Sequence, residues 1–207
     1  TSQSISTETL DAITATADAR DVRVEFAGQV FQNTTVGITV IEVIGVLVAG
    51  AVLVVTFGSL LAAGMPLAAA LIGIGITIGG ILGVAAFAPV SSSAPLLALM
   101  IGLAVGIDYS LFILSRHRTQ LARGETPHES AGIAVGTAGS AVVFAGLTVI
   151  IALPGLLVVG VPFLSVMGIG AAVAVTVAML AATTLLPAFM GLAGGRLVPR
   201  EGSRAWK

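Results

Sequence analysis

The stretch PLAAALIGIGITIGGILGVAAF (residues 66–87) contains no charged side chain and is long enough to cross a lipid bilayer. A membrane-spanning helix needs about 20 apolar residues, because the hydrocarbon core is about 30 Å thick. Similar apolar runs occupy approximately residues 37–57, 96–115, 133–153 and 161–190. A helix satisfies its own backbone hydrogen bonds in lipid, and the runs lack the alternation of a β-barrel strand. We therefore predict an all-α polytopic membrane protein, with a five-helix transmembrane bundle over residues 36–195.

The composition also indicates a lipid environment. Hydrophobic residues make up 57% of the chain, charged residues only 9%, and the mean hydropathy is +1.10. Soluble proteins carry about 25% charged residues, so this chain could not cover a water-exposed surface. The net charge of −1 gives no reason to expect a nucleic-acid partner, and the absence of cysteine excludes disulfides and thiolate metal sites. The composition therefore predicts the lipid bilayer as the main partner.

Residues 1–35 differ from the rest because they are polar with an acidic bias. Residues 1–20 are compatible with a short amphipathic helix, and Val22–Phe26 alternates apolar and charged residues as a strand does. We interpret this segment as the C-terminal tail of an extracytoplasmic, porter-like α/β domain, although a short disordered tail would have a similar composition. The chain starts at Thr1, which suggests a piece of a longer protein.

Basic residues near the ends of the runs predict the orientation, since Lys and Arg are enriched on the cytosolic side. Seven lie in the loop after the third run and in the basic tail 196–207, against two in the N-terminal segment. The seven are Arg116, Arg118, Arg123, Arg196, Arg200, Arg204 and Lys207, and the two are Arg20 and Arg23. We predict a multi-pass protein of the cell (inner or plasma) membrane, with the N-terminal segment extracytoplasmic and the C-terminus cytosolic.

Glycines recur at a spacing of four residues within the runs. Small residues at this spacing allow two membrane helices to approach closely. The glycines concerned are Gly75, Gly79 and Gly83, then Gly102 and Gly106, then Gly132 and Gly136. We expect them to serve helix packing in a compact bundle.

Asp108 is the acidic residue that lies deepest within an apolar run. It is about 18 Å from the Leu96 end of its run and about 10 Å from the Ser115 end. An Asp at the centre of a membrane helix costs about 2.5–3.5 kcal/mol on insertion scales, and such residues are functional more often than not. Desolvation favours the protonated carboxyl, so we predict that Asp108 carries a proton between the two sides. The alternative is a permanently neutral Asp that holds helices together.

Other polar residues are weaker candidates. Tyr109 lies on the glycine stripe and could orient a carboxylate on a facing helix. Thr137, Ser140 and Thr148 interrupt the fourth run and could bond to Asp108, although such hydroxyls usually bond to their own helix. We expect His117 and His128 to be solvated in the basic loop. The sequence shows no nucleophile–base pair and no metal-binding or phosphate-binding motif, so we predict a protein that is not an enzyme and needs no cofactor.

Several blocks resemble the MMPL family of the resistance–nodulation–division superfamily. GIDYSLF (106–112), followed by Ser115-Arg116-His117-Arg118, resembles the fourth transmembrane helix of the first half of these transporters. The blocks TFGSLLAAGMPL (56–67), TAGSAVVFAGLTVIIAL (137–153) and LLPAFMGLAG (185–194) resemble the end of the second, the fifth and the end of the sixth helix. The resemblance covers most of residues 28–197.

The resemblance implies a proton-driven exporter of lipids or other hydrophobic compounds, built from two similar halves. Asp108 and Tyr109 match an Asp-Tyr proton relay that faces a second pair in the other half. The first helix, most of the soluble domain and the second half are absent here, so the implied partner is that second half or another subunit, and protons are the coupling ion. A lipid-sensing or sterol-sensing module, which need not transport, has the same helical block and is the alternative.

Overall fold

The computed structural model describes residues 7–18, 40–87 and 93–198, and these form helices joined by short turns. In the N-terminal unit, α1 (Thr7–Asp18) is the short helix predicted within residues 1–20. The predicted strand Val22–Phe26 lies outside the described residues. No strand occurs in the described ranges, which confirms the all-α prediction.

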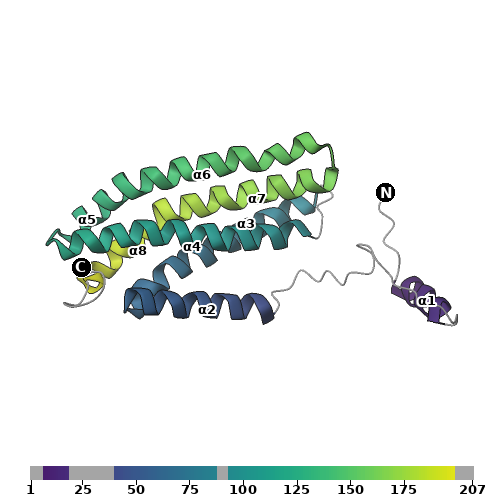
Figure 1. Ribbon diagram of the computed structural model, residues 1–207, viewed down its shortest axis with the longest axis horizontal. Coiled ribbons are helices and arrows are strands. Elements are labelled where there is room, and N and C mark those ends of the chain that lie inside the picture. The colour runs from purple at the N-terminus through teal and green to yellow at the C-terminus, as the bar shows by residue number, and fades with distance from the viewer. Residues whose placement is uncertain (1–6, 19–39, 88–92, 199–207) are drawn as a thin grey trace. The chain divides into compact units, whose positions relative to one another are not determined.

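The second unit holds the apolar helices (Figure 1). Its elements are α2 (Val40–Phe57), α3 (Leu60–Ala85), α4 (Ser93–Ala122), α5 (Pro127–Ala134), η1 (Val135–Gly139), α6 (Ser140–Ala152), η2 (Leu153–Val159), α7 (Pro162–Leu180), η3 (Ala181–Leu185), α8 (Leu186–Ala193) and η4 (Gly194–Leu197). Four continuous helical segments within the described residues, 60–85, 94–122, 127–159 and 162–197, are long and apolar enough to cross a membrane. The first predicted span corresponds to α2, which has 18 residues.

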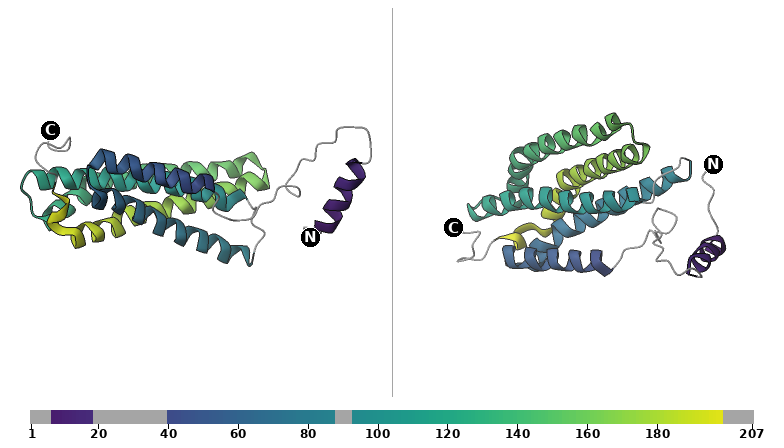
Figure 2. Two further views of the ribbon diagram at one scale, coloured as in Figure 1. Left: turned by 90° about the horizontal axis from the view of Figure 1, so that it is seen from below. Right: turned by 45° about the vertical axis from the view of Figure 1, so that its right-hand side comes forward.

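The central layer of the bundle consists of α3, α4 and α7. Helix α4 packs along both α3 and α7, α2 packs on α3, and α5 and α6 pack on α4 and α7 respectively. Figure 1 and the right-hand view of Figure 2 show α2 at one edge of the bundle and α6 at the other. We call the end where α2 ends, α3 begins and α4 ends the Arg118 end.

Two helices contain a π-helical turn, and α4 does not. Turn η1 lies between α5 and α6, and turn η3 lies between α7 and α8. Both turns contact α4 and each other. A π turn inserts an extra residue into a helix and is frequent at functional sites. The central helix α4 and its neighbour α3 therefore contain no π turn, whereas the α7–α8 segment and the α5–α6 segment each contain one.

Several helices begin and end at different residues from those predicted. Helix α3 starts at Leu60 because Ser59 caps it, its Oγ accepting a hydrogen bond from the Ala62 N–H at 3.4 Å. Gly58, with φ of 63°, adopts the left-handed conformation that the tight turn from α2 requires. Helix α4 continues to Ala122, so Arg116 and Arg118 belong to a helix and not to a loop.

The predicted packing glycines fall into two groups. A Cβ on Gly106 would lie 3.2 Å from Ala70 Cβ, and one on Gly102 would lie 3.5 Å from Ala174 Cβ, so both glycines let α4 approach its neighbours closely. The others, Gly75, Gly79, Gly83, Gly132 and Gly136, are exposed and have nothing within 4 Å of a Cβ. Two other glycines, which were not predicted, also lie at close contacts. A Cβ on Gly146 would meet the Met179 side chain, and one on Gly168 would meet the Leu153 carbonyl oxygen.

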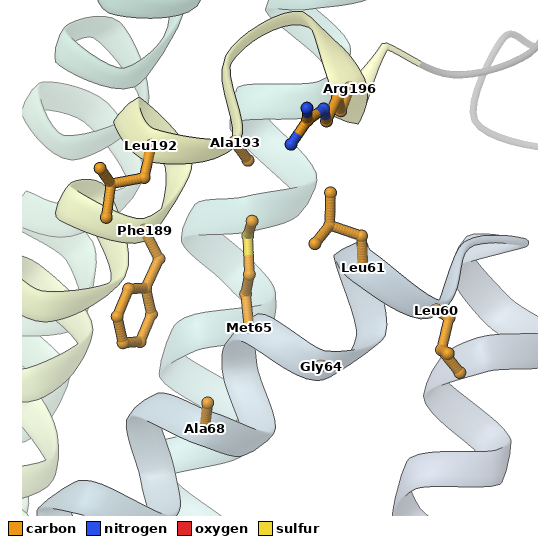
Figure 3. Close-up of a pocket in the computed structure, with 9 residues that line it drawn as sticks. All are labelled: Leu60, Leu61, Gly64, Met65, Ala68, Phe189, Leu192, Ala193 and Arg196. Atoms are coloured by element: carbon orange, nitrogen blue, oxygen red, sulfur yellow. The ribbon is translucent and has the colours of Figure 1, made fainter.

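An apolar groove of about 670 Å³ lies at the Arg118 end of the bundle. The first turns of α3 line one side and α8 lines the other (Figure 3). Arg196 of η4 lies at the rim, where its guanidinium reaches over the space between Leu61 and Ala193. The groove is therefore apolar along its length and cationic at one end.

Candidate functional site

Asp108 occupies the middle of α4. It lies about 22 Å from the start of this helix and about 21 Å from its end at 1.5 Å per residue. The side chain is on an exposed face of the bundle, and it makes no hydrogen bond or ion pair with any residue that the structure describes. The helices of this chain therefore leave the carboxyl without a partner, and its counterpart has to come from lipid, water or another part of the protein.

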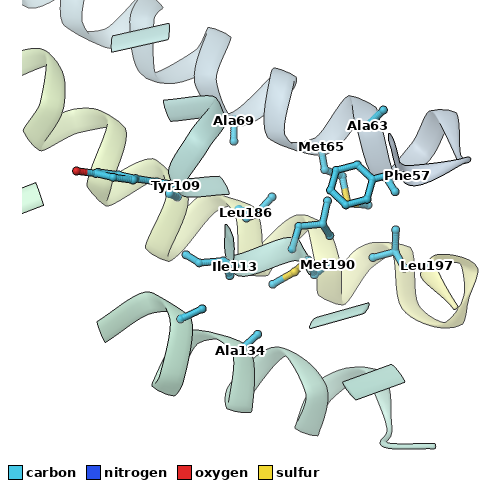
Figure 4. Packing of buried hydrophobic residues seen from close by; sticks show 14 of the residues in the cluster. Phe57, Ala63, Met65, Ala69, Tyr109, Ile113, Ala134, Leu186, Met190 and Leu197 are labelled. Atoms are coloured by element: carbon cyan, nitrogen blue, oxygen red, sulfur yellow. The ribbon is translucent and has the colours of Figure 1, made fainter. Parts of the chain in front are cut away.

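Tyr109 points into the bundle, about 100° around α4 from Asp108. It is 9% exposed and belongs to the main apolar core, together with Ala69, Ile113 and Leu186. Figure 4 shows Tyr109 at one end of this core, with Ile113 and Leu186 following toward Phe57. With Tyr109 packed in the core, Asp108 lies on the adjacent, open side of α4.

Ser110, which follows Asp108 and Tyr109 on α4, is a polar residue that was not predicted as a site residue. Its side chain is 1% exposed, and its Oγ has no hydrogen-bond partner among the described residues. Buried hydroxyls are normally hydrogen-bonded, and Ser in membrane helices usually bonds to its own helix. The signal available in the sequence was its position directly after the Asp-Tyr pair.

The hydroxyls of the fourth run bond to their own helix. Thr137 Oγ1 donates to Ile133 O at 2.7 Å, Ser140 Oγ to Thr137 O at 2.7 Å, and Thr148 Oγ1 to Phe144 O at 2.9 Å. All three side chains are exposed, and none bonds to Asp108. A side chain that donates to its own carbonyl keeps its oxygen lone pairs available for a further donor.

A cavity of about 370 Å³ links the Asp108 face of α4 with Thr137. Phe112 and Ser115 line it, and they lie four and seven residues after Asp108, on the same face of the helix. Arg116 and Thr119 continue the lining toward the end of α4. Polar groups therefore follow the face of Asp108 toward the Arg118 end.

His117 is fully buried, so the prediction that it is solvated was wrong. Its Nδ1 lies 2.8 Å from Ser130 Oγ, and the same Oγ donates to the His117 carbonyl oxygen at 2.7 Å. Because the hydroxyl has one hydrogen, the ring Nδ1 is assigned as the donor to Ser130. His117 Nε2 is buried and has no partner among the described residues, which favours the neutral ring. His128 is exposed, as predicted.

Replacing Ser130 by Ala is expected to destabilise the full-length protein by about 1–3 kcal/mol, because it leaves the buried His117 Nδ1–H without an acceptor. Thermal or denaturant unfolding in detergent measures this change. Ser165→Ala is the matched control, since its Oγ bonds only to its own helix at Val161 O. Equal stabilities of the two variants would contradict the assigned role of the Ser130–His117 pair.

Arg118 holds three helices together at the end of the bundle. Its Nη1 donates to Phe57 O at 2.9 Å and its Nε donates to Leu197 O at 3.3 Å. The guanidinium carbon also lies 5.2 Å from the centroid of the Phe57 ring. Arg118 is 4% exposed. These contacts satisfy carbonyl groups at the ends of α2 and η4, which a helix C-terminus otherwise leaves unpaired.

Long apolar helices, together with a carboxyl at the middle of one of them, define a multi-pass membrane protein. No group of three or more potential metal ligands occurs among the described residues. The chain belongs to the MMPL family, whose profile matches residues 1–207. The resemblance of the GIDYSLF block to this family of transporters is thereby confirmed.

Three relatives illustrate the similarity. Membrane protein YdfJ of Bacillus subtilis is 52% identical over 166 residues, which is 80% of this chain and 23% of YdfJ. Heme uptake protein MmpL11 of Mycobacterium tuberculosis is 39% identical over 155 residues, 75% of this chain and 16% of MmpL11. Trehalose monomycolate exporter MmpL3 of the same species is 34% identical over 157 residues, 74% of this chain and 16% of MmpL3. The chain thus spans less than a quarter of each relative.

Proposed function

We propose that this chain is part of a proton-driven exporter of lipids or other hydrophobic compounds, and that Asp108 and Tyr109 form its proton relay. The observation that carries the proposal is the position of Asp108, at the middle of α4 and without a partner among the described residues. A carboxyl that costs free energy in lipid and that no described residue neutralises is suited to take up and release a proton.

In the proposed cycle, the proton acts as the coupling ion and no other cofactor takes part. Uptake of a proton by Asp108 neutralises the carboxyl and weakens its attraction to groups in the second half of the transporter. Release of the proton restores the charge and the attraction, so the two halves rock against each other. Tyr109, packed in the apolar core, sets the orientation of α4.

The polar lining along the Asp108 face supports a route for the proton. Ser115, Thr119 and Thr137 line the cavity that follows this face toward the Arg118 end. We place this end in the cytosol because the basic residues gather there, and we place the N-terminal segment outside the cell membrane. Thr137 is then the relay neighbour nearest to this route, whereas Ser140 and Thr148 lie farther along the same helix.

We infer the class of cargo from the names of the relatives. MmpL3 is named as an exporter of trehalose monomycolate, and MmpL11 as a protein of heme uptake, so export is our inference for this chain and not a property of every relative. The exposed glycines, Gly75, Gly79, Gly83, Gly132 and Gly136, are suited to pack against helices of the second half or of a partner subunit.

Transport by the full-length protein in proteoliposomes is expected to depend on a proton gradient. A fluorescent lipid cargo and a pH-sensitive dye inside the vesicles would report both fluxes. A protonophore should stop cargo movement, and an imposed gradient should restore it. Cargo movement that is unaffected by the protonophore would contradict the proposal, and lipid binding without any transport would favour the lipid-sensing alternative.

A further inference from the structure

A polar pocket with two arginines lies at the Arg118 end of the bundle, outside the Asp108 site. Its volume is about 400 Å³, and Arg118 and Arg196 both line it. Arg118 is 4% exposed and uses Nε and Nη1 for the carbonyls of Leu197 and Phe57, whereas its Nη2 bonds to no described residue. Neither arginine forms an ion pair within the described ranges. The pocket therefore carries positive charge that no described side chain balances, which favours an anion.

The start of α3 contributes to the same pocket. Gly58, Ser59 and Leu60 line it, and they form the turn into this helix of 26 residues. The N-terminus of a helix leaves backbone N–H groups unpaired and carries a partial positive charge, so it attracts phosphate and carboxylate groups. The helix terminus and the two guanidinium groups therefore favour the same kind of ligand.

The apolar groove joins this pocket directly, since Leu60 and Arg196 line both. Its walls are otherwise apolar, with Leu61 and Met65 on α3 and Phe189 on α8 (Figure 3). Its volume of about 670 Å³ lies within the range of about 300–1,000 Å³ that ligand pockets have. An anionic head and an apolar chain would each find a matching surface.

The groove also opens sideways. Leu60 and Leu192 line it and are 78% and 83% exposed. The groove is therefore open on this side among the described residues, and a chain already in the membrane could enter it there without an opening of the helices. This access distinguishes a membrane lipid from a soluble metabolite.

We propose that an anionic phospholipid of the bilayer binds here. Its phosphate lies between Arg118, Arg196 and the start of α3, and one acyl chain lies in the groove between α3 and α8. Basic pockets between membrane helices are known to bind anionic head groups, and the combination with an adjoining groove selects a phospholipid over free phosphate. The site is separate from Asp108, so it stands whether or not the proton relay is correct.

The test uses the delipidated full-length protein and native mass spectrometry with dioleoylphosphatidylglycerol and dioleoylphosphatidylcholine. We expect tighter binding of phosphatidylglycerol. Arg196→Gln removes an exposed charge, and Gly64→Leu fills the groove, since nothing lies within 4 Å of a Cβ on Gly64. Each variant should weaken phosphatidylglycerol binding about tenfold, which corresponds to about 1.4 kcal/mol.

Matched controls are Arg123→Gln, at an exposed arginine in the turn after α4, and Gly80→Leu, at an exposed glycine of α3 outside the groove. Both should bind phosphatidylglycerol like the unmodified protein, and unfolding without lipid checks that every variant is folded. Unchanged binding in folded Arg196→Gln and Gly64→Leu would overturn the proposal, and would fit a groove covered by another helix of the protein. Equal binding of phosphatidylcholine, or displacement of the lipid by inorganic phosphate alone, would overturn it as well.

Discussion

Replacing Asp108 by Asn is expected to abolish proton-coupled transport by the full-length protein while leaving its folding intact. Asn has nearly the same shape but cannot exchange a proton in this way. The side chain lies on an exposed face, and its replacement breaks no hydrogen bond or ion pair with a described residue. Removal of the charge also lowers the cost of about 2.5–3.5 kcal/mol of placing Asp in the membrane, although the amide of Asn keeps part of that cost. We therefore expect unchanged or higher thermal stability together with transport at background.

Two further variants make the Asp108 experiment specific. Asp108→Glu keeps a carboxyl and should retain part of the proton-coupled transport. Glu125→Gln makes the same acid-to-amide change in the exposed turn between α4 and α5 and should transport normally. Proton and cargo fluxes in proteoliposomes provide the measurement. Normal coupled transport by folded Asp108→Asn would exclude Asp108 as the proton carrier.

Replacing Gly106 by Leu is expected to destabilise the bundle strongly and to displace α4. A Cβ at this position would lie 3.2 Å from Ala70 Cβ and 3.4 Å from Ala70 Cα, and the second of these is a backbone atom that cannot rotate away. Overpacking a close contact typically costs about 1–3 kcal/mol, and a leucine adds three further carbons at a backbone contact, so we expect the upper part of this range or more. Unfolding in detergent measures the loss.

Gly79→Leu provides the comparison for Gly106→Leu. Gly79 is exposed on α3 and has nothing within 4 Å of a Cβ, so no contact of this chain opposes the change. A large loss of stability in this variant would indicate that Gly79 packs against a part of the full-length protein outside this chain. A small loss in Gly106→Leu would show that α3 and α4 are not held as closely as the structure describes.

Hydropathy was sufficient to predict the helices because lipid leaves the backbone few alternatives. Their ends were harder to predict, and α4 shows why. Its last turns contain Arg116, His117 and Arg118, which read as a loop because they are polar. Two of these side chains find partners far away in the sequence, Arg118 at Phe57 and Leu197 and His117 at Ser130. Such pairings arise from tertiary packing and leave no local signal.

In the candidate site, too, helix geometry could be predicted from the sequence, whereas the packing of the helix could not. The sequence alone showed that Asp108 is costly and that Tyr109 lies about 100° away, because helix geometry fixes both. Which of the two faces the bundle depends on the neighbours of α4. Gly106 lies on the packed face, where it approaches Ala70 closely, and Tyr109 is buried in the core one turn further along α4. The glycines of α3 have the same spacing but lie on an open face. Spacing alone does not tell which helix, if any, a glycine packs against.

Helix α4 can move as one rigid rod, because it is uninterrupted between Asp108 and Arg118. Asp108 and Arg118 lie ten residues apart on this helix, a span of about 15 Å, and no π turn or internal proline separates them. In the proposed cycle, a tilt of α4 at Asp108 would also move Arg118, and with it the ends of α2 and η4 to which Arg118 is bonded. Two of the segments that contact α4, α5–α6 and α7–α8, contain a π turn, η1 or η3, at which they can bend while α4 stays straight.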